Sequence, residues 1–292
     1  MKLGYLVKYS AEEPARAQRL GFDCLEIHAG SWFGNGVYGD KKQRQQILDD
    51  LQQAREENGI SVSCIAHYGG GLALRGKELV DSFKKALDIA RECGANVVST
   101  IAARENPEKT VRDNIPAYKK SYSAIAQLAE DAGCTIAFEN WPAFGGYPLA
   151  GKTMPYCPEA WSLMFDAVPN SVMGLEFDPS HLYWQGIDHM AMLRQFKDRV
   201  HHVHAKDTEI FYDKRNQVGV FGDGWWLYRI PGLGEIQWAP FISELYTIGY
   251  AGGVCIEHED GRFDGWRKES DLKKYEQGLR LGHACLRPLI QP

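Results

Sequence analysis

The sequence has no long hydrophobic run. Its apolar residues never reach the roughly 18 in succession that a membrane-spanning helix requires, so a membrane is not expected among its partners. The first residues, Met1 to Val7, are too few and too soon followed by polar residues for a signal peptide. They are typical of a β-strand that begins almost at once.

The sequence also lacks an excess of basic residues. Its 33 Lys and Arg against 38 Asp and Glu give a formal net charge of −5. Nucleic-acid-binding domains usually carry a basic patch, so no nucleic-acid partner is expected.

Paired cysteines are absent as well. Seven cysteines are scattered singly, no two in a CxxC pattern, and their odd number argues against a full disulfide framework. Most of them lie in apolar segments, where a thiol behaves as a small hydrophobic side chain. A reducing, cytoplasmic location is therefore expected.

No Gly-x-Gly-x-x-Gly turn follows the first segment, which argues against a doubly wound dinucleotide-binding sheet. No linker, repeat or low-complexity tract divides the 292 residues. Instead, β-type segments alternate with helical ones. The eight predicted strands are 2–7, 22–28, 60–67, 95–101, 134–139, 172–177, 199–207 and 253–257. Eight strand-then-helix units in a chain of this length predict an α/β fold, a single (β/α)8 barrel domain spanning 1–292.

One predicted strand carries a row of polar residues. In 199–207, His202, His204 and Lys206 alternate with other residues and so share one face. Buried polar rows need partners and often mark a functional site.

Ionisable residues stand at six of the eight predicted strand ends, where (β/α)8 enzymes carry their chemistry. These residues are Glu26, His28, His67, Glu139, Asp178, His181, His204, Lys206, Asp207, Glu257 and His258.

Four of these residues predict a metal site. Glu139, Asp178, His204 and Glu257 come from the fifth to the eighth strand, which are neighbours around the barrel. Three carboxylates and one imidazole suit a divalent cation, with Mn²⁺ the first choice and Mg²⁺, Co²⁺ or Zn²⁺ as alternatives. The competing interpretation pairs these carboxylates with Lys206, Arg229 or Arg104.

Four motifs resemble the xylose-isomerase-like barrel superfamily of sugar isomerases and epimerases. They are Phe138-Glu139-Asn140-Trp141, Phe177-Asp178-Pro179-Ser180-His181, His202-Val203-His204-Ala205-Lys206-Asp207 and Ile256-Glu257, and the resemblance covers the whole chain in order. It implies one metal on Glu139, Asp178, His204 and Glu257. It also implies that Glu139 and Glu257 act as an acid/base pair and that His181 contacts the substrate.

The sequence departs from two relatives within that superfamily. Ketose 3-epimerases carry a further glutamate after the first ligand, and residues 141–147 contain none. Endonuclease IV binds three zinc ions with extra histidines, whereas Ser99-Thr100 stands on the fourth strand here and the net charge does not suit DNA.

The expected chemistry is proton abstraction next to a sugar carbonyl through a metal-stabilised enediolate, as in a sugar isomerase or epimerase. If a leaving group lies β to the carbonyl, the same site is a lyase, like the C-glycoside deglycosidase catalytic subunits that this branch also resembles. A sugar-binding barrel without catalysis is a further alternative.

Four residues are predicted to contact a sugar or keto-sugar substrate: His67, Trp141, Lys206 and Arg229. Trp32, Trp225 and Trp226 either stack on the sugar or pack a lid. The segment 208–234 is too rich in aromatic residues for disorder and is expected to form a lid or a contact with a second subunit, of the same or another chain. His181 is an alternative base.

Overall fold

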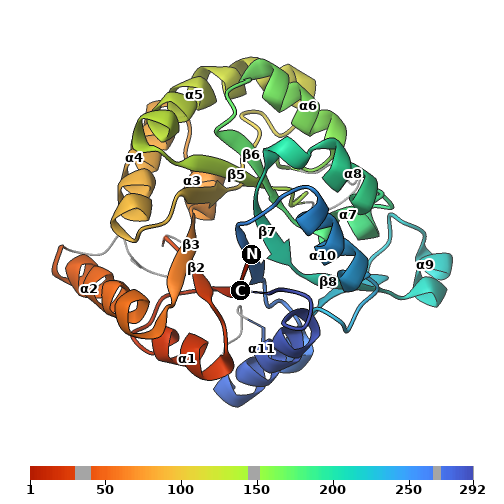
Figure 1. The fold of residues 1–292 in the computed structure, drawn as a ribbon. Helices are drawn as coiled ribbons and strands as arrows, with labels where there is room; N and C mark the ends of the chain where they lie inside the picture. Colours follow the sequence, from red (N-terminus) through yellow and green to blue (C-terminus); the bar gives the residue numbers. More distant parts are fainter. Residues whose placement is uncertain (30–40, 144–151, 266–270, 292) are drawn as a thin grey trace.

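The computed structural model describes residues 1–29, 41–143, 152–265 and 271–291, and its ribbon is a ring of helices around a barrel of strands (Figure 1). Eight parallel strands close in the order β1-β10-β7-β6-β5-β4-β3-β2. They are β1 (Lys2–Val7), β2 (Cys24–His28), β3 (Ser61–Ala66), β4 (Val97–Thr100), β5 (Thr135–Glu139), β6 (Met173–Phe177), β7 (Val200–Ala205) and β10 (Gly253–Ile256). The predicted (β/α)8 barrel is therefore confirmed.

The helices lie outside the barrel. They are α1 (Glu13–Leu20), α2 (Lys41–Asn58), α3 (Tyr68–Ala73), α4 (Gly76–Glu92), α5 (Val111–Ala132), α6 (Pro158–Ala167), α7 (Pro179–Trp184), α8 (His189–Gln195), α9 (Tyr212–Val218), α10 (Trp238–Thr247) and α11 (Leu272–Leu286). Short 3₁₀ turns occupy Lys197–Arg199 and Gly261–Phe263. None of the described helices combines the length and the hydrophobicity needed to cross a bilayer.

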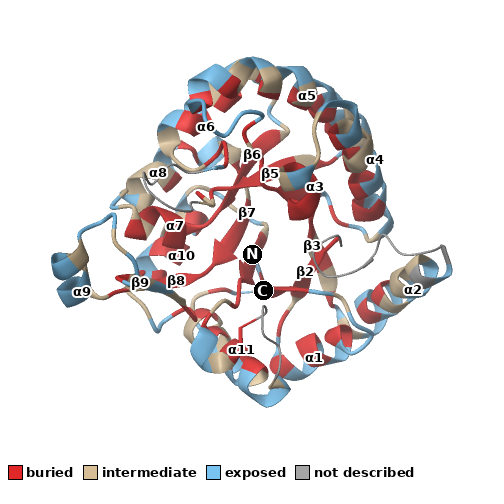
Figure 2. Cartoon of the chain, turned by 180° about the vertical axis from the view of Figure 1, so that it is seen from behind, coloured by how far each residue is buried: buried red, intermediate tan, exposed pale blue. Residues whose placement is uncertain are grey.

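Local sequence signals explain the boundaries of the longest helix. Thr110 and Asp113 form a reciprocal capping box at the start of α5, and Gly133 ends it with a φ of 64°. The helices bury one face against the strands and leave the other exposed, as the colouring in Figure 2 shows. Barrel closure joins the first and last strands, with Lys2 opposite Gly253 and Tyr5 opposite Ile256.

Two segments that directly follow barrel strands are helical. The glycine-rich run after β3 forms α3, because glycine permits a close approach to β4: a Cβ atom at Gly71 would collide with the carbonyl oxygen of Ile101. The run after Asp178 forms α7, with the Asp178 side chain capping the backbone N–H of Ser180.

The long segment after β7 is folded rather than irregular. Strands β8 (Asp207–Ile210) and β9 (Trp226–Arg229) pair antiparallel and, with α9 between them, form what we call the hairpin. In Figure 1, α9 projects from the edge of the ring. Trp184, Ile210 and Trp225 make a small separate core beneath it, and Trp226 stacks on Trp184 with ring centroids 4.7 Å apart.

Candidate metal and catalytic site

The structure brings the four predicted metal ligands together at the carboxyl ends of the strands. Glu139 ends β5, Asp178 follows β6, His204 lies near the end of β7 and Glu257 follows β10. Their ligand-type atoms all lie within 4.8 Å of one another, and all four side chains are buried. We call this set the mouth cluster.

Backbone contacts fix the orientation of Asp178. The Asn140 side chain donates to the Asp178 carbonyl at 2.9 Å and accepts from its N–H at 2.8 Å, which ties β5 to β6. The Asp178 Oδ1 atom accepts the N–H of Ser180 at 2.8 Å. The other oxygen, Oδ2, therefore faces the mouth cluster.

Two buried atoms of the mouth cluster lack a hydrogen bond. Neither Asp178 Oδ2 nor His204 Nδ1 makes one with any residue that the structure describes. His204 Nδ1 lies 3.1 Å from Glu257 Oε2 without the geometry of a hydrogen bond. Asp178 Oδ2 has an ion-pair partner in Lys206 Nζ at 3.0 Å, but neither atom makes the hydrogen bond that buried polar atoms usually have. An oxygen and an imidazole nitrogen within 4.8 Å of each other are suitable ligands for a cation.

The buried ammonium group of Lys206 borders the mouth cluster. Its Nζ contacts Glu257 and lies 3.0 Å from Asp178 Oδ2 and 3.3 Å from Glu259 Oε2. It also lies 4.5 Å from the centre of the Tyr228 ring. Glu139 Oε1 lies 3.9 Å from the same Nζ. The pairing with Lys206 that the competing interpretation expects is thus present, because Lys206 lies within ion-pair distance of all three carboxylates of the cluster.

The electrostatics show that Lys206 does not balance the cluster by itself. Burial and the nearby Glu257 carboxylate raise the pKa of Glu139 well above its ordinary value. Burial opposes ionisation of Glu257 too, but Lys206 and His204 hold its pKa well below the ordinary value. An additional cation would allow both carboxylates to ionise.

His181 lies beside the same cluster. Its Nε2 is 3.3 Å from Glu139 Oε1 and 3.2 Å from Lys206 Nζ, and its Nδ1 is 2.8 Å from the Tyr228 hydroxyl. Burial, then the Lys206 charge, lowers the pKa of His181 to about 3, so the imidazole is neutral at neutral pH. Because Tyr228 belongs to β9, the hairpin reaches the site.

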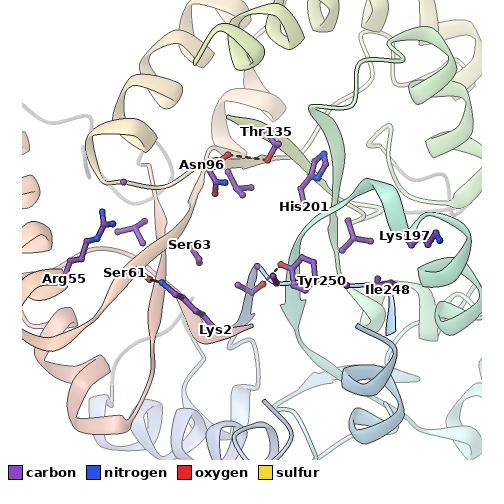
Figure 3. Close-up of a pocket in the computed structure, with 18 residues that line it drawn as sticks. Lys2, Arg55, Ser61, Ser63, Asn96, Thr135, Lys197, His201, Ile248 and Tyr250 are labelled. Atoms are coloured by element: carbon purple, nitrogen blue, oxygen red, sulfur yellow. Dashed lines mark hydrogen bonds between the residues drawn. The ribbon is translucent and has the colours of Figure 1, made fainter. Parts of the chain in front are cut away.

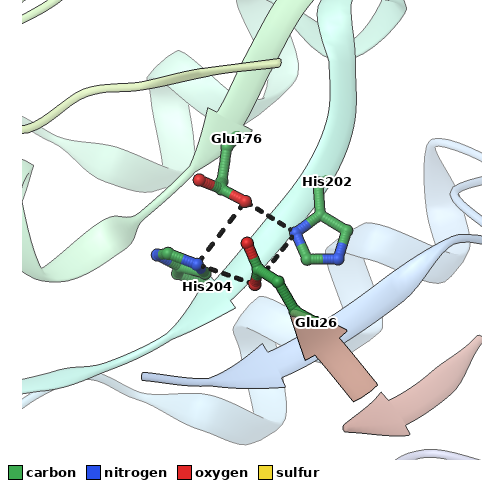
Figure 4. Close-up of side chains that lie close together, drawn as sticks. All are labelled: Glu26, Glu176, His202 and His204. Carbon is green, nitrogen blue, oxygen red and sulfur yellow. Dashed lines mark hydrogen bonds and ion pairs between the residues drawn. The ribbon is translucent and has the colours of Figure 1, made fainter. Parts of the chain in front are cut away.

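A second group lies deeper in the barrel. Glu26, Glu176, His202 and His204, which we call the inner cluster, have ligand-type atoms within 4.8 Å of one another (Figure 4). Glu26 Oε2 lies 3.0 Å from His204 Nε2, and Glu176 Oε1 lies 2.9 Å from His202 Nδ1. All four side chains are fully buried.

The two clusters differ in how many of their side-chain oxygen and nitrogen atoms make hydrogen bonds. Every side-chain oxygen and nitrogen of Glu26, Glu176 and His202 has a hydrogen-bond partner, supplied by the cluster or by Ser63, Tyr68 and Ser99. The mouth cluster leaves two atoms without one. A divalent cation therefore fits the mouth cluster better.

Two predicted substrate contacts lie away from the mouth cluster. The His67 ring contacts Ser82 Oγ at 2.9 Å and packs edge-on against Phe83, both on α4. The Arg229 guanidinium contacts Glu209 at 2.6 Å and Asp260 at 3.5 Å, so two carboxylates already balance its charge. Neither prediction gains support from the structure.

The predicted tryptophans divide into two groups. Trp141 follows β5 at the mouth and is half-buried against the apolar cluster of Leu6, Ala66, Tyr68 and Ile101. Trp225 and Trp226 pack within the hairpin, as a lid would require. Trp32 and residues 144–147 of the segment expected to lack a glutamate lie outside the described residues.

Sequence reasoning missed several residues. The sequence pattern does not single out Tyr68, Glu176 or Tyr228, and it gives Asn140 only as part of a motif and Glu26 only as a strand-end residue. Glu176 stands two residues before Asp178 on β6, and that alternation could have placed it in the barrel interior. Asp207, a strand-end carboxylate in the sequence, accepts hydrogen bonds from the backbone N–H groups of Gly232 and Ile236 and from the Trp238 indole N–H.

The opposite end of the barrel contains a cavity of about 480 Å³ (Figure 3). Its lining includes Lys2, Ser61, Thr135 and Gly253, which begin or lie at the start of their strands. In (β/α)8 enzymes this face serves stability and the other face carries the chemistry. The cavity is therefore not the candidate catalytic site.

Proteins of known sequence resemble this chain over most of its length. It is 26% identical to the uncharacterized protein YfiH of Bacillus subtilis, covering 89% of this chain and 93% of that one. It is 24% identical to an inosose dehydratase of Geobacillus thermodenitrificans, covering 81% of each.

Solved structures show the same fold. The D-psicose 3-epimerase of Clostridium cellulolyticum, solved with D-tagatose, gives a TM-score of 0.70 at 16% identity. The IolI protein, solved with a zinc atom, gives 0.68 at 18% identity, and both comparisons cover 100% of each chain. The family model described as xylose isomerase-like TIM barrel matches residues 14–287. This chain belongs to the xylose isomerase-like TIM barrel family.

Proposed function

We propose that this protein is a divalent-metal-dependent enzyme that removes a proton next to the carbonyl group of a sugar or keto-sugar. The observation that carries the proposal is the mouth cluster: four ligand-type side chains converge at the catalytic end of the barrel, with two buried atoms left without hydrogen bonds. Glu139, Asp178, His204 and Glu257 would hold the cation, for which Mn²⁺ is our first choice. Once bound, it would polarise the carbonyl and oppose the charge of the enediolate.

The chain's own residues supply the proton transfer. Glu257 is held ionised by Lys206 and His204, which suits a base, whereas Glu139 is the carboxyl group whose ionisation is disfavoured, which suits an acid. His181 is neutral and is the alternative base or a substrate contact. Lys206 can donate to a substrate oxygen, and Trp141 offers a ring at the mouth.

Two outcomes fit this chemistry. Returning the proton to the other face or the adjacent carbon gives epimerisation or isomerisation. Expelling a hydroxyl group β to the carbonyl gives dehydration, and the inosose dehydratase that matches 81% of this chain favours it as the second candidate.

The test is incubation of metal-loaded enzyme in deuterated water with ketoses, 3-keto-glycosides and inosose. We expect solvent deuterium to enter the position next to the carbonyl of the true substrate. Turnover without deuterium incorporation would indicate hydride transfer and contradict the proposal, leaving Glu139 and Glu257 as ligands only.

A further inference from the structure

The His204 ring connects the two clusters. Its Nδ1 faces the mouth cluster, 3.1 Å from Glu257 and 3.8 Å from Glu139, and its Nε2 faces the inner cluster, 3.0 Å from Glu26 Oε2. A neutral imidazole has one N–H and one lone pair. If Nδ1 gives its lone pair to a cation at the mouth, the proton must be on Nε2.

Glu26 is placed to accept that proton in a hydrogen bond. The distance from His204 Nε2 to Glu26 Oε2 is 3.0 Å, whereas the Glu176 oxygen lies 3.5 Å away, outside the usual range. The Tyr68 hydroxyl also lies 3.3 Å from Nε2 but gives its proton to Glu176 at 2.6 Å. Glu26 is therefore the principal acceptor.

Groups outside the mouth fix the Glu26 carboxylate in turn. Its Oε1 accepts from Ser99 Oγ at 3.1 Å, and the oxygen of the Tyr68 hydroxyl lies 3.3 Å from it. All three side chains are buried, on β2, on α3 and on β4. The carboxylate thus has one oxygen held by the Ser99 hydroxyl, and its other oxygen makes its shortest contact with His204.

We propose that Glu26 is a positioning residue for the metal site: it holds His204 in the tautomer that presents Nδ1 to the cation and strengthens that nitrogen as a ligand. Metal-binding histidines commonly donate their second N–H to a carboxylate in this way. The inference rests on the proposed function, because it takes the mouth cluster to be the metal site.

Zn²⁺ affinity, measured by competition with a chromophoric chelator, tests this role. Glu26→Leu removes the acceptor, so we expect affinity to fall about 10–100-fold. Glu26→Gln keeps an acceptor but loses its charge, and its loss should be smaller. Glu176→Gln is the matched control: it is equally buried in the inner cluster but is not the partner of His204, so its affinity should match wild type.

A spectroscopic measurement separates positioning from a general structural defect. In ¹⁵N-histidine-labelled, Zn²⁺-loaded protein, we expect a downfield Nε2–H resonance of His204 that shifts upfield in Glu26→Gln and stays in place in Glu176→Gln. The Gln variants are nearly isosteric, so this comparison remains valid if Glu26→Leu does not fold.

The outcomes distinguish the two proposals. If wild type binds Zn²⁺ but Glu26→Gln and Glu26→Leu bind it equally well with the His204 resonance unmoved, the role of Glu26 is overturned and the metal site stands. If wild type and Asp178→Asn bind Zn²⁺ equally, the metal site itself is wrong, and the role of Glu26 fails with it.

Discussion

The two carboxylate oxygens of Asp178 make different contacts: Oδ1 accepts the N–H of Ser180 at the start of α7, and Oδ2 faces the mouth cluster. Asp178→Asn replaces a charged ligand by a neutral one, and Glu257→Gln does the same across the cluster. We expect both variants to retain much less metal after dialysis than wild type, measured by elemental analysis. Glu259→Gln is the control, because Glu259 also contacts Lys206 but is not in the cluster. Equal metal in all four proteins would refute the assignment.

His181 contacts Glu139, Lys206 and Tyr228 without belonging to the predicted ligand set. If it is the base, His181→Ala should abolish exchange of the carbonyl-adjacent proton in deuterated water and leave metal affinity close to wild type. If Glu257 is the base, Glu257→Gln should lose exchange too, part of that loss coming from weaker metal binding. Full exchange in His181→Ala would leave His181 a substrate contact at most.

At the scale of elements, the hairpin has its own core. The Trp225 side chain is only 3% exposed and packs with Trp184 and Ile210. Trp225→Ala should therefore lower the free energy of unfolding of the hairpin by about 3–5 kcal/mol. We expect trypsin to cut this variant in α9, at Lys214 or Arg215, faster than wild type. Leu227→Ala is the control: the Leu227 side chain is 48% exposed, so trypsin should cut this variant no faster than wild type. Rapid cleavage of the wild-type hairpin would contradict a folded lid.

Strand positions could be predicted from the sequence because most strands of this barrel are short, largely apolar segments that are followed by a polar residue. The run Ile136-Ala137-Phe138-Glu139 shows both features, and the structure ends β5 at Glu139. The hairpin could not be predicted, since its strands are only four residues long and the contacts that stabilise them, such as Trp226 on Trp184, come from elsewhere in the chain.

The mouth cluster could be anticipated because strand order alone places the ends of β5, β6, β7 and β10 side by side. The inner cluster could not, because its meeting point depends on which interior layer each side chain occupies. His67 illustrates the limit: it follows β3 as expected, but its ring faces α4. A residue's place at a strand end does not fix the direction of its side chain.

For the whole molecule, buried histidines predict sensitivity to acid. Burial lowers the pKa of His67 to about 4 from an ordinary value of 6.5. Between pH 6.5 and pH 4, His67 therefore binds a proton in the unfolded chain but stays neutral in the folded chain. The contribution of neutral, buried His67 to the free energy of unfolding is fully present above pH 6.5. It is lost as the pH falls toward 4, and a pKa shift of this size corresponds to about 3 kcal/mol.

We expect the melting temperature to fall steeply between pH 6.5 and 4, and to fall less steeply in His67→Gln. His258, whose pKa burial likewise lowers to about 4, should contribute in the same direction. An identical pH profile in wild type and His67→Gln would contradict this account. The KM of His67→Gln at neutral pH also tests the predicted substrate contact.

The charged interior of the barrel has a consequence for engineering. Buried ionic pairs are often less stabilising than apolar side chains of similar volume, by about 1–4 kcal/mol. Replacing Glu176 and His202 together by leucine would leave Tyr68 bonded to Glu26, and Ser63 bonded to the Leu25 carbonyl. We therefore expect the double variant to melt at a higher temperature than wild type, with every predicted metal ligand unchanged.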